Sequence, residues 1–294
     1  MTVAAKWLGL CAAVVLLGWF LTRPETVDPA ELQGVVPDPA NGERLFHAGG
    51  CSACHGADLG GGLALETDFG TFYAPNISTD ELAGIGAWTT LDLANAMLRG
   101  TSPDGKHYYP AFPYTSYTRM KVQDVADLKA FLDTFAPVNR KSTEHDIAFP
   151  WNVRRGIGIW NRRYLDSNFI VVVNIDDALL LRGRYLVEAV GHCGECHTTR
   201  DSFGGLEPTM WLAGAPNPDG EGWVPNITSQ EDGLADWSAN DIAYYLATGF
   251  TPDFDTVGGS MVEVQENLAR LPDADRAAIA AYLKFIPPKA GPAR

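Results

Sequence analysis

The chain has 294 residues, of which 46% are hydrophobic, and its formal net charge at pH 7 is −14. This length gives room for two domains of ordinary size, each with an apolar core. The acidity excludes a nucleic-acid-binding protein, because nucleic acids attract proteins of opposite charge.

The first predicted element is an apolar helix at the N-terminus. The stretch from Val3 to Leu21 is apolar apart from Lys6, and with Lys6 reaching outward it nearly spans a bilayer core of about 30 Å. A cleaved signal peptide is the alternative, but no pair of small residues follows the apolar run. We therefore expect a single transmembrane anchor over residues 1–23. Residues 24–38, rich in proline and acids, predict an extended tether.

The pentapeptide pattern C-x-x-C-H then occurs twice, at residues 51–55 and 193–197. This pattern is the attachment signature of c-type haem. The two cysteine sulfurs form thioethers with one porphyrin edge, and the histidine that follows ligates the iron. The sequence therefore predicts two covalently bound haem c groups. Their binding residues are Cys51, Cys54 and His55 in the first motif, and Cys193, Cys196 and His197 in the second.

Three other uses of the cysteines are weaker. A four-cysteine zinc site requires the two pairs to converge, and it gives no reason for a histidine after each pair. A thioredoxin-like redox pair follows a strand in a βαβ unit, and no such unit is visible here. Structural disulfides would also use four cysteines, but they give no reason for C-x-x-C-H to occur twice. Cys11, in the apolar N-terminal stretch, is interpreted as a small apolar residue.

An internal duplication surrounds the motifs. Each copy contains a helix before the motif, a Pro-Asn-Ile-Ser/Thr string, a helix ending at glycine, and a C-terminal helix with helical apolar spacing. The corresponding segments are 41–46 and 181–186, 75–78 and 225–228, 91–98 and 240–247, and 122–135 and 273–285.

The predicted fold class is all-α, with two tandem cytochrome c domains after the N-terminal helix. Domain 1 covers residues 39–139 and domain 2 covers residues 179–290, with a connecting segment over 140–178 that matches neither copy. The connecting segment is rich in arginine and tryptophan, so some of these side chains are candidates to hold haem propionates. The Asn-Ile-Ser/Thr strings also spell glycosylation sequons, but their identical place in both copies favours a structural role.

The sixth iron ligands are predicted from the same duplication. Met120 and Met261 each precede the last helix of their copy, and a thioether from that position can close over the distal haem face. Gap-filling in an apolar core is the ordinary alternative for a methionine. His107, in the loop before Met120, is the one serious competitor. The loop from Tyr108 to Tyr117, dense in aromatics and proline, is expected to keep water from the first haem.

These residues resemble the cytochrome c subunits of bacterial membrane-bound alcohol, gluconate and related dehydrogenases. The strings that carry the resemblance are 75–78, 84–88, 109–114 and 191–198, and the similarity extends over roughly residues 40–287. The resemblance implies His/Met ligation, with Met120 and Met261 at the ligand positions. It also implies electron transfer from a periplasmic dehydrogenase subunit to quinone or an oxidase. The best-known members carry three haem units, whereas this chain has two and an N-terminal anchor.

Two classes of function follow. The first is an electron-transfer subunit or carrier, not itself an enzyme, that relays electrons from a dehydrogenase or respiratory complex to quinone, an oxidase or a soluble cytochrome. The second is a haem enzyme, such as a dihaem peroxidase or a thiosulfate dehydrogenase, which needs an open or unusual iron ligand. A methionine in each copy favours the carrier, and no catalytic residue is predicted. We expect attachment to the bacterial inner membrane, with the haem domains in the periplasm.

Overall fold

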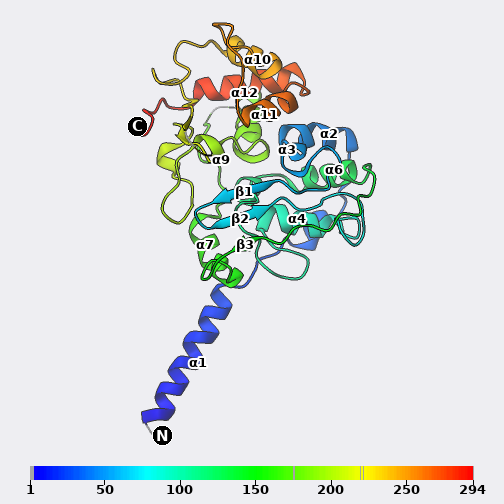
Figure 1. Ribbon diagram of the computed structural model, residues 1–294, viewed down its shortest axis with the longest axis vertical. Coiled ribbons are helices and arrows are strands. Elements are labelled where there is room, and N and C mark those ends of the chain that lie inside the picture. The colour runs from blue at the N-terminus through cyan, green and yellow to red at the C-terminus, as the bar shows by residue number, and fades with distance from the viewer. Residues whose placement is uncertain (1–2, 175, 219, 221, 294) are drawn as a thin grey trace.

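The computed structural model describes residues 3–293 except 175, 219 and 221. Two helical units lie against each other, and helix α1 (Val3–Leu21) projects away from them (Figure 1). One continuous hydrophobic core runs through both units, with residues such as Leu45 and Leu128 in the first and Val187 and Ile279 in the second.

The predicted fold class is wrong in two respects. The structure contains short strands as well as helices, so it is not all-α. Among the described residues, no helix is both long enough and apolar enough to cross a membrane. Helix α1 has 19 residues, one of them Lys6, and at 1.5 Å per residue its length is about 28 Å. The predicted transmembrane anchor is therefore corrected to a projecting helix.

The helices of the two units correspond in order. The first unit contains α2 (Pro39–Ala48), α3 (Cys51–His55), α4 (Thr90–Arg99), α5 (Tyr114–Tyr117) and α6 (Val122–Leu132). The second contains α8 (Ala178–Tyr185), α9 (Gly194–His197), α10 (Ala239–Thr248), α11 (Met261–Leu268) and α12 (Asp273–Phe285).

Helices α4 and α10 show why the copies fold alike. Each begins with a capping box, formed by Thr89 with Asp92 in α4 and by Ser238 with Asp241 in α10. Each ends at a glycine in the left-handed conformation, as the sequence predicts.

A glycine lets the first and last helices of each unit cross closely. A Cβ at Gly42 in α2 would lie 2.0 Å from the carbonyl oxygen of Asp127 in α6. A Cβ at Gly183 in α8 would lie 2.0 Å from the carbonyl oxygen of Ala278 in α12. Since no Cβ fits at either position, glycine sets the distance between the paired helices.

The second unit contains one extra residue before its motif. Gly42 lies nine residues before Cys51, whereas Gly183 lies ten residues before Cys193. A π-helical turn, η3 (Leu186–Val190), follows α8 and accommodates the additional residue. The leading helix thus delivers its motif to the corresponding place in both units.

Glu188, in this π-helical turn, is fully buried. Its carboxylate accepts hydrogen bonds from the backbone N–H groups of Ile170, at 2.5 Å, and Val171, at 3.1 Å, and from the hydroxyl of Tyr282. Burial raises the pKa of this carboxyl group. Its hydrogen bonds fasten the connecting segment to the second unit.

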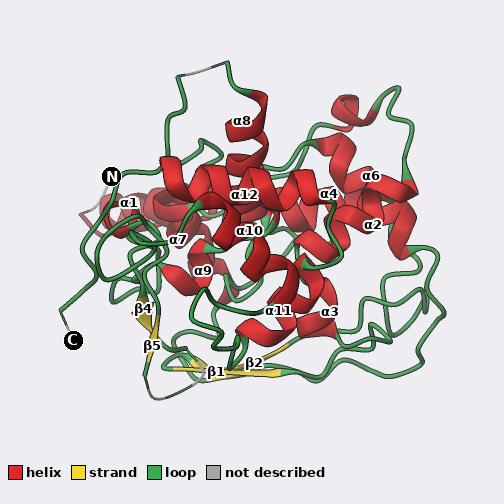
Figure 2. Cartoon of the chain, turned by 90° about the horizontal axis from the view of Figure 1, so that it is seen from above, coloured by secondary structure: helices red, strands yellow, loops and turns green. Residues whose placement is uncertain are grey.

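Short strands lie in segments where the all-α prediction placed none. Strands β1 (Ala64–Thr67), β2 (Gly70–Tyr73) and β3 (Asp146–Ile147) form an antiparallel sheet in that order. Strands β4 (Ala215–Pro216) and β5 (Trp223–Val224) pair antiparallel in the second unit. Figure 2 shows β1, β2, β4 and β5 along one side of the helices. They are too short to show the alternating pattern by which strands are recognised in a sequence.

Residues 24–38 lie against the first unit. Val27 is buried, and its N–H donates to the side-chain oxygen of Asn95 at 2.8 Å. The hydroxyl of Thr101 donates to the carbonyl of Glu25 at 2.7 Å, and η1 (Pro29–Leu32) forms a short helical turn. This segment is therefore fixed by specific contacts, in contrast to the extended tether that its composition predicts.

The arginines of the connecting segment fasten the end of α1. From η2 (Arg154–Gly156) and α7 (Ile157–Tyr164), Arg155 donates to the carbonyl of Trp19 and Arg162 donates to that of Leu21, each at 2.5 Å. The Arg155 guanidinium also lies 3.9 Å from the ring centroid of Trp19. These side chains bind backbone and aromatic groups near α1.

We predict that Gly42→Ala and Gly183→Ala each destabilise the fold, because the added methyl group forces the paired helices apart. Overpacking of this kind costs about 1–3 kcal/mol of unfolding free energy, or somewhat more against backbone. Denaturant unfolding measures the loss. Gly156→Ala is the matched control, since nothing lies within 4 Å of its Cβ position. Equal stability of Gly183→Ala and the control would contradict the close crossing.

Candidate functional site

Each C-x-x-C-H motif forms a short helix directly after a left-handed residue. Gly50 has φ 57° before α3, and His192 has φ 40° before Cys193 and α9. Both motif helices follow another helix closely, in contrast to a thioredoxin-like pair after a strand. The described cysteines form no disulfide, and the described part of the chain contains no cluster of three or more metal-ligating side chains. These findings disfavour the disulfide, thioredoxin and zinc alternatives.

The motif histidines are oriented in the same way in both units. The Nδ1 atom of His55 lies 2.7 Å from the carbonyl oxygen of Pro75, and that of His197 lies 2.8 Å from the carbonyl oxygen of Pro225. A hydrogen bond from Nδ1 fixes the ring and leaves Nε2 as the ligating nitrogen. Burial lowers the pKa of both imidazoles, which favours the neutral, ligating form.

Two buried asparagines hold the loops that carry these proline carbonyls. Asn76 donates to the carbonyls of Val138 and Arg140, at 2.6 and 2.9 Å. Asn226 donates to the carbonyl of Lys289 at 2.7 Å, and to Asp232. Their side-chain oxygens also accept the N–H groups two residues later, at Ser78 and Thr228. Because both asparagines are buried and bonded, the sequons have the structural role that the duplication indicates.

The structure places the two predicted methionine ligands at different points of their units: Met120 lies after α5 and two residues before α6, whereas Met261 lies at the start of α11 and twelve residues before α12. Met120 is buried directly before α6, and its N–H donates to the carbonyl of Tyr117 at 2.8 Å. Met261 is half-buried as the first residue of α11. Met97 lies within α4 and is buried in the core, as its helical position predicts.

His107, the competing ligand, is engaged elsewhere. It is buried, with Nε2 2.8 Å from the carbonyl oxygen of Thr22 and Nδ1 3.5 Å from the side-chain nitrogen of Asn161. Both ring nitrogens therefore face the end of α1 and helix α7. Burial lowers the pKa of this imidazole. This position argues against His107 as an iron ligand.

The two motifs meet at their N-terminal ends. A Cβ at Gly49 would lie 3.4 Å from the carbonyl oxygen of Val190, and a Cβ at the corresponding Gly191 would lie 3.3 Å from that of Ala48. The Nε2 atom of His192 lies 3.2 Å from the carbonyl oxygen of Gly49. This reciprocal approach places the start of one motif beside the start of the other.

Sequence analysis missed the roles of two residues that lie between the cysteines of the motifs. Glu195 accepts hydrogen bonds from the hydroxyls of Thr115 and Ser116 in α5 of the first unit, at 3.1 and 3.0 Å. Ser52, in the first motif, donates to Asn267 in α11 of the second unit at 3.3 Å. Their position between the two cysteines was visible in the sequence, but the spacing of the motif does not predict what these residues contact.

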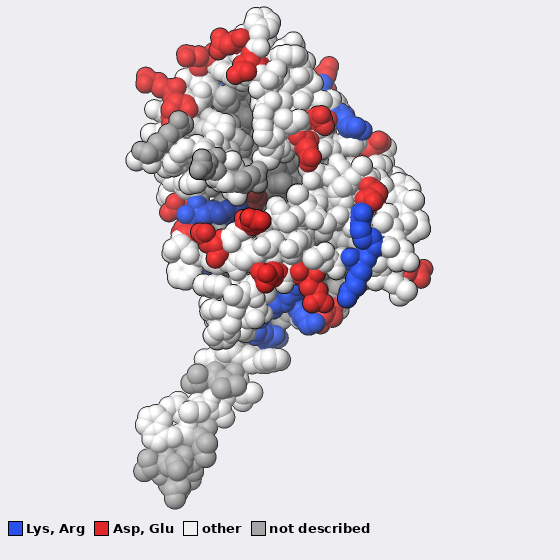
Figure 3. Space-filling view, viewed as in Figure 1, with Lys and Arg blue, Asp and Glu red and all other residues white. Residues whose placement is uncertain are grey.

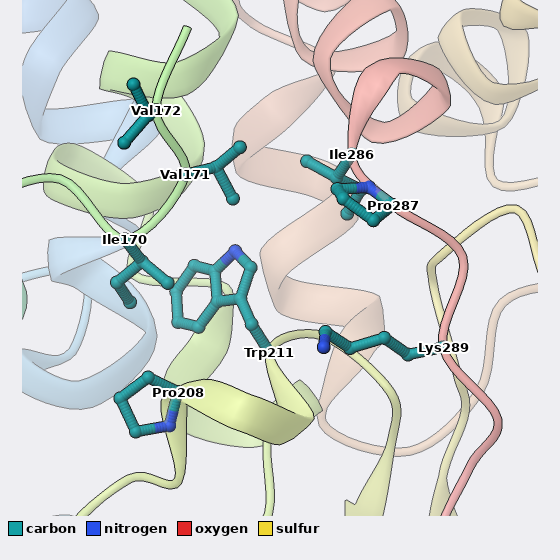
Figure 4. Close-up of a pocket in the computed structure, with 8 residues that line it drawn as sticks. All are labelled: Ile170, Val171, Val172, Pro208, Trp211, Ile286, Pro287 and Lys289. Atoms are coloured by element: carbon teal, nitrogen blue, oxygen red, sulfur yellow. The ribbon is translucent and has the colours of Figure 1, made fainter.

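An apolar cavity of about 320 Å³ lies beside the second motif, between the connecting segment and the chain end (Figure 4). Its lining includes Ile170, Val171, Trp211 and Ile286. The ring of Trp211 would lie 2.1 Å from a Cβ at Gly194, so the indole packs directly on helix α9. No motif residue lines this cavity, so it belongs to the packing behind the motif.

The donor set at each motif fits a covalently attached haem. Two cysteine thiols and one histidine with an oriented ring lie on α3 in the first unit, and on α9 with its N-cap residue Cys193 in the second. Cys54 and Cys196 are exposed. The loop from Tyr108 to Tyr117 contributes the buried rings of Tyr114 and Tyr117 to the first unit. A pair of such sites in one chain can hold two redox groups at a fixed separation.

Comparison with known proteins agrees with this geometry. The family model described as Cytochrome c matches residues 39–136. A dihaem c-type cytochrome of Cereibacter sphaeroides is 52% identical over 92% of this chain and 93% of its own length. The fructose dehydrogenase cytochrome subunit of Gluconobacter japonicus is 35% identical over 94% of this chain. The gluconate 2-dehydrogenase cytochrome c subunit of Pantoea cypripedii is 36% identical over 83%.

The chain spans 58% of the length of each of these two dehydrogenase subunits, but nearly all of the Cereibacter protein. The resemblance to cytochrome c subunits of dehydrogenases is thus confirmed, and so is the prediction of two covalently bound haem c groups. The chain belongs to the family of dihaem c-type cytochromes.

Proposed function

We propose that this protein is an electron relay that receives electrons from a dehydrogenase and passes them through both haems to a further acceptor. The observation that carries the proposal is the close approach of the backbones that lead into the two motifs, at Gly49 and Gly191. Bound haem c supplies one-electron chemistry at its iron. The chain holds the two attachment sites at a fixed separation.

Each unit has the residues for two axial ligands. His55 and His197 are the proximal ligands in this proposal, with their Nδ1 atoms held by Pro75 and Pro225. Met120 and Met261 are the distal ligands in this proposal, and each lies between the glycine-ended helix and the last helix of its unit. A thioether ligand raises the reduction potential relative to a second histidine, which suits a relay toward a higher-potential acceptor.

A dehydrogenase partner is supported by the relatives that carry this architecture. Fructose and gluconate 2-dehydrogenases each have a cytochrome subunit similar to this chain. The net charge of −14 favours a basic docking surface on the partner. Acidic side chains gather over the second unit, whereas basic side chains lie where α1 joins the body (Figure 3). We therefore place the partner contact on the second unit.

The haem-bearing units belong in the periplasm in this proposal. Covalent haem attachment takes place outside the cytoplasm, and two C-x-x-C-H motifs require that the units be exported.

We predict that Met120→Ala and Met261→Ala each remove about half of the weak sulfur-to-iron band near the red end of the oxidised spectrum, and that each lowers one reduction potential. The band and a redox titration measure both effects. Met97→Leu is the control, because Met97 is buried in α4. An unchanged spectrum in either alanine variant would refute the ligand assignment for that unit.

We also predict that the full chain co-purifies with dehydrogenase subunits and is reduced by them when their substrate is added. Reduction should reach both haems, since the backbones that lead into the two motifs lie close together. Absorbance at the reduced haem bands measures its extent, and the isolated chain with substrate alone is the control. Rapid turnover of peroxide or thiosulfate by the isolated chain would instead support the haem-enzyme alternative.

A further inference from the structure

Each motif contributes one side chain that forms hydrogen bonds to the other unit, and each of these two contacts is called a brace below. The second motif contributes Glu195, whose side chain is 11% exposed, to the helix α5 that precedes Met120. The first motif contributes Ser52 to helix α11, which begins at Met261. Each attachment helix therefore contacts the methionine-bearing segment of the other unit.

The contact at Glu195 is specific. One carboxylate oxygen accepts from both Thr115 and Ser116, while the other accepts from Arg200 at 2.5 Å. Ser116 is buried, so its hydroxyl has little access to water if Glu195 is removed. Hydrogen bonds to a charged group are stronger than those between neutral groups.

Backbone turns carry this contact to Met120. The N–H of Thr118 donates to the carbonyl of Tyr114, and the N–H of Met120 donates to that of Tyr117, at 2.9 and 2.8 Å. The guanidinium of Arg119 donates to the carbonyl of Thr115 at 2.6 Å. The segment from Tyr114 to Met120 is thus one bonded turn, anchored on the second motif at Glu195.

The contact of the first motif with helix α11, at Ser52, is weaker than the contact at Glu195 but corresponds to it. The side-chain oxygen of Asn267 lies 3.2 Å from Nδ1 of His47 and accepts from Ser52 at 3.3 Å. The side-chain nitrogen of Asn267 donates to the carbonyl of Glu263 at 2.9 Å, within the same helix. Helix α11 is therefore held on the first unit by one buried amide.

We propose that Glu195 and Ser52 are positioning residues, each stabilising the methionine segment that closes over the haem of the opposite unit. This inference rests on the proposed methionine ligation. It implies that the two haem sites are coupled. A structural change at one attachment motif alters the stability of the methionine segment in the other unit, because Glu195 and Ser52 belong to both. The coupling needs no conformational change larger than a shift of α5 or α11.

The test is displacement of the methionine by added imidazole, followed in the full haem-loaded chain. Glu195→Ala should raise the imidazole affinity of the first haem roughly tenfold, because the Met120 segment opens more easily without its charged acceptor. The double variant Thr115→Val with Ser116→Ala should also raise the imidazole affinity of the first haem, because it removes the two hydroxyls that donate to Glu195. Glu195→Gln retains an oxygen for both hydroxyls but lacks the charge, so it should raise the affinity by less than Glu195→Ala does.

Thr134→Val is the matched control, since its exposed hydroxyl donates only to the carbonyl of Phe131. Ser52→Ala tests the reciprocal brace and should raise the imidazole affinity of the second haem by a smaller factor. Met120→Ala and Met261→Ala assign each imidazole-binding phase to one haem. An effect of Glu195→Ala confined to the second haem would overturn the proposal.

Hydrogen exchange of residues 114–121 separates this inference from the ligand assignment. Loss of the brace should speed exchange there in Glu195→Ala, whether or not Met120 ligates iron. Faster exchange with a spectrum unchanged in Met120→Ala would keep the brace and refute the methionine ligand. Unchanged exchange in Glu195→Ala, with normal haem content, would refute the brace.

Discussion

The close approach of two backbones, at Gly49 and Gly191, is the constraint on which the rest of the structure depends. Each glycine lies two residues before a motif and faces a carbonyl of the other unit. Because the motifs meet there, the methionine-bearing segments that follow later in the chain also reach the neighbouring unit. The cross contacts of Glu195 and Ser52 are a consequence of that shared start.

The helix pairs explain how two diverged copies retain one geometry. Gly42 and Gly183 set the crossing of the leading and final helices in their units. The second copy has an additional residue before its motif, which η3 (Leu186–Val190) absorbs as a π-helical turn. A π-helical turn costs less free energy than a shift of the whole helix, because the buried helix crossing and the position of the motif are both kept.

The connecting segment has a structural role that composition did not indicate. Its arginines suggested haem propionates, yet Arg155 and Arg162 bind the carbonyls at the end of α1. Its backbone at Ile170 and Val171 binds the buried carboxylate of Glu188. One segment thus contacts α1, the first unit through β3 and the second unit through Glu188, which ties the N-terminal helix to both.

The sequence by itself determined the two attachment motifs, the duplication, the family resemblance and the order of the paired helices, because spacing and capping are local properties of the chain. It predicted an all-α protein and a transmembrane anchor, which the structure corrects. Only the tertiary structure decided the use of His107, the short strands and the contacts of Glu195 and Ser52. These depend on residues far apart in sequence, whose proximity arises only when the two units pack.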